Sequence, residues 1–104
     1  MTKYLVLYRA KTTAEEQMAQ GSPEQAQASM DAWTAWASKA GDAVVDLGSP
    51  LAIVEAGGDQ GDPVGGYSIL QADSREAVAA VLDGHPHAEW GGTIEILEFL
   101  PMPG

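Results

Sequence analysis

Both histidines of this chain lie in one short stretch, DGHPHAEWGG, which runs from residue 83 to residue 92. An imidazole can accept and release a proton near neutral pH, so His85 and His87 are the first candidates for general acid–base catalysis. Pro86 fixes the backbone between them and favours an extended His85. Because residues i and i+2 of an extended segment point the same way, both rings should reach one pocket or both should face solvent.

A carboxylate that orients one imidazole would complete such a catalytic site. Asp46 is our candidate, because it stands among apolar neighbours in VVDLG, where a carboxylate is unusual. The alternative is an outward-facing side chain on an edge strand. Substrate binding is assigned to Tyr8, Trp33 and Arg9, whose guanidinium could hold a carboxylate or pair with Asp46.

Two other interpretations of the histidines stay open. A cationic histidine just past a helix C-terminus is stabilised by the helix dipole by about 0.3–1 kcal/mol, so the pair could simply end a helix. A metal site built from both imidazoles and either Asp46 or Glu89 is a weaker alternative, because the spacing fixes no third ligand. We expect neither a metal nor a cofactor.

Composition predicts one globular domain that spans residues 1–104. The formal net charge of -10, with five scattered basic residues, argues against nucleic acid and against anionic membrane surfaces as partners. No apolar run approaches the roughly 20 residues of a transmembrane helix. The chain has no cysteine, and a cytoplasmic location is the simplest expectation.

The hydrophobic pattern predicts the element order β-α-β-β-α-β. Strands are expected over residues 3–9, 42–55 with a bend at 48–50, 66–72 and 92–101, and helices over 22–41 and 73–84. Ser22 and Asp73 are the expected N-caps. This order indicates an α+β, ferredoxin-like fold, with two helices on one face of an antiparallel sheet.

The first and last strands are apolar on both faces. In the first strand Tyr4, Val6 and Tyr8 point one way, while Leu5 and Leu7 point the other. The last strand likewise places Ile94 and Ile96 opposite Leu97 and Phe99. Since the helices cover one face only, we expect a homodimer whose sheets pack face to face, with a cavity for a small ligand.

Three segments carry a resemblance over nearly the whole chain: KYLVLYR, MDAWTAWASKAGDAVVDLGSPL and GGYSILQADSREAVAAVLDGHPHAEWGGTIEILEFLPMPG. Together they resemble the YCII-related family, also described through its DGPF-type members. The resemblance implies a dimeric α+β barrel of ferredoxin-like subunits, a polar pocket and an enzymatic role. Better-studied members pair a histidine on the first helix with an aspartate near its end. Residues 22–40 contain no histidine, so that pair is not carried over.

The leading functional hypothesis is therefore a small enzyme that performs acid–base chemistry on a small organic molecule. His85 or His87 would be the base, Asp46 the orienting group and Arg9 the anchor for negative charge. The alternative is a non-catalytic ligand-binding or interaction module with the same dimer cavity. A third interpretation is a structural dimer whose histidines only cap a turn.

Overall fold

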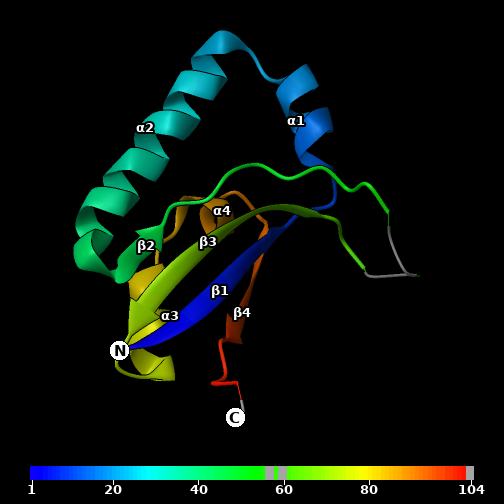
Figure 1. The fold of residues 1–104 in the computed structure, drawn as a ribbon. Helices are drawn as coiled ribbons and strands as arrows, with labels where there is room; N and C mark the ends of the chain where they lie inside the picture. The colour runs from blue at the N-terminus through cyan, green and yellow to red at the C-terminus, as the bar shows by residue number, and fades with distance from the viewer. Residues whose placement is uncertain (56–57, 59–60, 103–104) are drawn as a thin grey trace.

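A computed structural model describes residues 1–55, 58 and 61–102 of the chain. Its elements, in order, are β1 (Thr2–Arg9), α1 (Ala14–Gln20), α2 (Pro23–Ala40), the 3-10 turn η1 (Gly41–Ala43), β2 (Val44–Asp46), β3 (Val64–Ala72), α3 (Arg75–Leu82), α4 (Pro86–Glu89) and β4 (Thr93–Glu98) (Figure 1). The strands form one sheet in the order β2-β3-β1-β4, and every neighbouring pair is antiparallel. This arrangement confirms the predicted α+β, ferredoxin-like fold.

The core lies between the helices and one face of the sheet. Alternate residues of β1 point into it, as a strand's period of two requires, and Tyr4, Val6 and Tyr8 are at most 3% exposed. The buried cluster is completed by residues of β3, α2 and α3, namely Leu70, Ala72, Trp36, Val78 and Leu82. The end of β1 and the second half of α2 therefore meet in the same core, and Tyr8 lies beside the α2 tryptophans.

The helix starts follow their capping residues. Ser22 accepts a hydrogen bond from the Gln25 amide and begins α2 as predicted. In α3 the cap is Ser74 rather than the expected Asp73, and its hydroxyl accepts from the Ala77 amide at 3.0 Å. Asp73 remains exposed one residue earlier.

Helix α1 was not among the predicted elements. It begins with a capping box in which Thr13 accepts from the Glu16 amide and Glu16 accepts from the Thr13 amide, a signal that the sequence TTAEE does contain. Residues 15–20 of α1 are exposed. The start of α1 lies against β3 at Gly65, whereas the rest of α1 and the first half of α2 extend beyond the sheet (Figure 1).

The predicted strand over residues 42–55 is wrong in its second half. Strand β2 ends at Asp46, and Gly48 turns the chain at a φ of 88°. Beyond the turn, Pro50 makes only an isolated bridge with Gly66, because proline has no amide hydrogen to donate to a ladder. Residues 52–55 are exposed, so their apolar character does not reflect burial in this chain.

Among the helices that the structure describes, none combines the length and hydropathy that crossing a membrane requires.

Candidate functional site

The two histidines lie at the start of α4, not in an extended segment. His85 has the expected extended backbone, but Pro86 occupies the first position of a short helix that contains His87. Proline is favoured there because its fixed φ suits a helix and its missing amide hydrogen is not needed. The side chain of His85 caps this helix: its Nδ1 accepts a hydrogen bond from the His87 amide at 3.0 Å. The prediction of an extended pair is therefore corrected, and the two rings are arranged by a helix turn.

His85 is completely buried, with 0% of its surface exposed. Its ring stacks on Tyr8 at 4.9 Å between centroids and meets the rings of Trp33 and Trp36 at 4.5 and 4.4 Å. Burial, together with the charge of His87, lowers the pKa of His85 to about 4. His85 is thus neutral near pH 7 and does not gain the dipole stabilisation expected of a cationic histidine at a helix end.

His87 is half-buried and lies against the end of β1. Its Nε2 is 2.7 Å from the backbone oxygen of Arg9. Because a carbonyl can only accept a hydrogen bond, Nε2 must donate the hydrogen, and Nδ1 is the ring nitrogen left to accept a proton. The ring of His87 also packs edge-on against Tyr8, with 5.4 Å between centroids.

Gly92 provides the space for this ring. A Cβ atom built on Gly92 would overlap the Nε2, Cε1 and Cδ2 atoms of His87. Sequence reasoning did not single out Gly92, although it belongs to the same DGHPHAEWGG stretch. The glycine pair after Trp90 was the available signal, since a glycine at the start of a strand often marks a close approach to the backbone.

Tyr8 supplies a ring face to this site and keeps its hydroxyl in the core. The hydroxyl donates to Ser68 Oγ at 2.8 Å, and Ser68 Oγ donates to the Leu47 carbonyl oxygen at 2.7 Å. Burial raises the pKa of Tyr8 to about 12. Tyr8 is only 3% exposed, so its ring packs against the other rings of the site and its hydroxyl has a buried partner.

The other two predicted binding residues lie on different elements: Trp33 on α2 and Arg9 next to Tyr8 at the end of β1. Trp33 is half-buried on α2, and its ring meets Tyr8 edge-on at 5.0 Å. The Arg9 side chain donates from Nε to Glu95 at 3.0 Å and from Nη1 to the Asp62 carbonyl oxygen at 2.8 Å. Arg9 therefore contributes to the site in an unforeseen way, through the backbone oxygen that holds His87.

Asp46 is placed at the end of β2 with different partners. One carboxylate oxygen accepts from the Tyr67 hydroxyl at 3.1 Å and the other from the Gly48 amide at 2.9 Å. The hydrogen bond and the negative charge of Asp46 raise the pKa of Tyr67. Within the described residues, neither imidazole is among the hydrogen-bond partners of Asp46. The group that orients His87 is the Arg9 carbonyl oxygen.

The imidazoles also do not converge as metal ligands. Nδ1 of His85 is taken by the His87 amide, and Nε2 of His87 is taken by Arg9. In the part of the chain that the structure describes, no group of three or more histidine, aspartate or glutamate side chains is placed to hold a metal ion.

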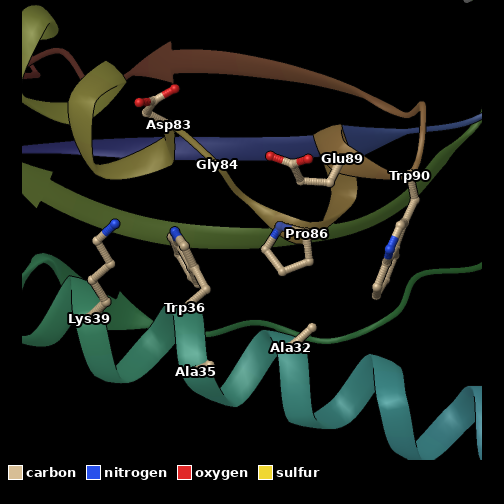
Figure 2. Close-up of a pocket in the computed structure, with 9 residues that line it drawn as sticks. All are labelled: Ala32, Ala35, Trp36, Lys39, Asp83, Gly84, Pro86, Glu89 and Trp90. Carbon is tan, nitrogen blue, oxygen red and sulfur yellow. The ribbon is translucent and has the colours of Figure 1, made fainter.

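A groove of about 360 Å³ lies between α2 and the segment that joins α3 to α4 (Figure 2). The indoles of Trp36 and Trp90 flank it, with Pro86 and Ala32 between them. Lys39 borders the groove from α2, while Asp83 and Glu89 border it from the opposite side. Trp90 is 58% exposed, which makes it available to a ligand in this groove.

The chain matches one known protein family over nearly its whole length. The model of the YCII-related domain matches residues 2–103. The chain belongs to this family. The resemblance expected from the sequence is thereby confirmed, while no curated protein matches the chain.

A solved structure with a similar fold is 5-chloro-2-hydroxyhydroquinone dehydrochlorinase from Burkholderia phenoliruptrix AC1100, in complex with 2,5-dihydroxybenzoquinone. The match covers 91% of each chain, with 17% sequence identity and a TM-score of 0.52. At this identity the likeness between the two chains is one of fold.

Proposed function

We propose that this YCII-related protein is a small enzyme that uses His87 to move a proton on a small organic molecule. The observation that carries this proposal is the contact between His87 Nε2 and the Arg9 backbone oxygen, at 2.7 Å. That contact fixes the hydrogen on Nε2 and leaves Nδ1 as the base. When Nδ1 takes a proton, the same carbonyl oxygen stabilises the imidazolium that forms, which is the task commonly given to a carboxylate.

We further propose that the substrate is a planar ring that carries acidic hydroxyl groups. The half-buried ring of Trp33 lies 4.5 Å from the His85 ring and 5.0 Å from the Tyr8 ring, centroid to centroid, and would offer a stacking or edge contact to such a molecule. The dehydrochlorinase with the similar fold acts on a hydroxyhydroquinone and binds a dihydroxybenzoquinone. A ring hydroxyl or an adjacent ring C–H would then supply the proton that His87 accepts.

Turnover of hydroxylated rings tests this function. The purified protein is incubated with 5-chloro-2-hydroxyhydroquinone and with 2,5-dihydroxybenzoquinone, and chloride release and exchange of ring protons with deuterium are followed. His87→Gln should lower either rate by about 10²–10⁴-fold, because it removes the proton acceptor. Glu24→Gln, an exposed change in the first turn of α2, should leave the rates unchanged. Wild-type rates equal to those in buffer, or a fully active His87→Gln variant, would contradict the proposal.

The groove beside Trp90 supports a second function, that of a non-catalytic binding module. Its lining includes neither imidazole, so a molecule held there would lie away from the proposed base. Binding of the same rings without exchange or chloride release would favour this function. In that case Trp90→Ala should weaken binding at least about tenfold, as expected for loss of an aromatic contact, while His87→Gln should leave it unchanged.

We also propose that the protein is a homodimer, formed through the sheet face that the helices leave uncovered. Leu5 pairs with Leu97 and with Ile69 on this face, and Leu97 and Phe99 are 41% and 47% exposed. Sedimentation at micromolar concentration should give twice the 10.9 kDa chain mass. Leu97→Glu should give the monomer, because two carboxylates would be buried in an apolar contact. Thr34→Glu, on the exposed side of α2, is the matched control. A monomeric wild type would contradict the dimer.

A further inference from the structure

His85 is a buried ring whose chemistry the proposed reaction does not use. Its Nε2 is the buried side-chain nitrogen or oxygen atom that lacks a hydrogen-bond partner in the described part of the chain. Its Nδ1 accepts a hydrogen bond, so the neutral ring carries its hydrogen on Nε2. Leaving a buried donor unsatisfied is unfavourable, and an apolar side chain at this position would avoid that cost. The burial of an imidazole here therefore calls for a specific role.

The hydrogen bond that His85 accepts comes from the backbone of His87 itself. This bond caps α4, which has only four residues. In so short a helix the cap fixes a large part of the backbone geometry, because few intrahelical hydrogen bonds exist to do so. The position of the His85 ring is fixed in turn by Tyr8, Trp33 and Trp36, whose rings lie within 5 Å of it, centroid to centroid.

Both imidazoles contact the end of β1. Tyr8 is in contact with both imidazoles, and the next residue, Arg9, provides the oxygen that holds His87. A shift of α4 relative to β1 would therefore break the contact between His87 and Arg9. The only hydrogen bond of the His85 ring in the described residues ties the start of α4 to this ring, and the ring is held against β1 by its stacking on Tyr8.

We propose that His85 is a positioning residue for His87: its Nδ1 holds the start of α4, so that His87 keeps Nε2 on the Arg9 carbonyl oxygen and presents Nδ1 as the base. The positioning of His87 by His85 is inferred from these contacts, whereas the catalytic purpose of that positioning rests on the proposed function. His85 itself does not contact substrate, because none of its surface is exposed. The lowered pKa of His85 agrees with this role, since a protonated Nδ1 could not accept the amide hydrogen.

Two substitutions separate the hydrogen bond from the packing of the ring. In His85→Asn the side-chain oxygen lies close to the place of Nδ1 and can cap the helix, because asparagine is among the best N-cap residues. In His85→Phe the ring site is filled, but no acceptor is present. His85→Gln serves as a third variant if the phenylalanine chain does not fold, because its acceptor lies one bond further from the backbone.

The experiment is an NMR measurement of ring ¹⁵N shifts and amide exchange on the full chain without substrate. Wild type and His85→Asn should show His87 with its hydrogen on Nε2 and a protected His87 amide. His85→Phe, or His85→Gln in its place, should show a mixture of His87 tautomers and an amide that exchanges about tenfold faster, as for one lost hydrogen bond. The same tautomer and protection in all variants would overturn the positioning role. Because no substrate is used, this result is independent of whether the rings proposed above are turned over.

Discussion

The wild-type protein should lose about 2 kcal/mol of its free energy of unfolding through His85 alone when the pH falls from 7 to 4. Above the unfolded pKa of 6.5 the ring is neutral in both states and contributes no pH dependence. Between 6.5 and about 4 the unfolded chain takes up a proton that the folded chain refuses, so stability falls as the pH falls. The full shift corresponds to roughly 3 kcal/mol, and somewhat less has been lost at pH 4, where about half of the folded rings are protonated.

Urea unfolding of wild type and His85→Asn at a series of pH values measures this effect. The variant lacks the imidazole, and all other titrating groups are shared, so the difference between the two curves isolates His85. The free energy of unfolding of the wild type, relative to that of His85→Asn, should fall between pH 6.5 and 4 and level off below pH 4. Parallel curves over this range would show that His85 titrates alike in the folded and unfolded chains.

Gly48→Ala should be the most destabilising of the alanine substitutions considered, with a loss of about 3 kcal/mol or more. Gly48 has a φ of 88°, which side chains rarely adopt. A Cβ atom built there would also overlap the backbone oxygen of Tyr67. That oxygen belongs to β3, in the middle of the sheet, so the clash cannot be relieved by a rotamer change.

Gly41→Ala is the matched control for this prediction. Gly41 also has a positive φ, of 57°, but a Cβ atom there would have no neighbour within 4 Å. Its φ of 57° and ψ of -125° lie in a region that side chains rarely adopt, so the substitution should cost about 1–3 kcal/mol, the conformational part of the penalty. The difference between the two midpoints in urea denaturation therefore measures the close approach of Gly48 to β3. Equal losses would mean that β3 moves away freely.

The parts of the fold that the sequence predicted are those with strong local signals. Helix α2 has a capping serine, a proline at its first position and a terminal glycine, and β1 alternates residues that prove to be buried and half-buried. The second half of the predicted 42–55 strand does not form, because Gly48 turns the chain and Pro50 has no amide hydrogen to donate to a ladder. Helix α1 was missed because its capping box precedes a segment without an apolar face.

The candidate site was predicted only in part, for a physical reason. Sequence identifies imidazoles and carboxylates, but the group that orients His87 is a backbone oxygen, which every residue has. Nothing in the side chain of Arg9 marks its carbonyl as a partner for a histidine 78 positions later. Likewise, the burial of His85 depends on three rings from β1 and α2, and only the packed structure brings those together.

Position 92 and position 87 cannot vary independently, because the ring of His87 lies against Gly92. The ring of His87 occupies the volume that any side chain at position 92 would need. In a related sequence, a residue other than glycine at this position therefore implies that the imidazole is absent or turned elsewhere. The pair of His87 and Gly92 can thus serve as a marker, read from an alignment, of which YCII-related chains keep this histidine on the end of β1.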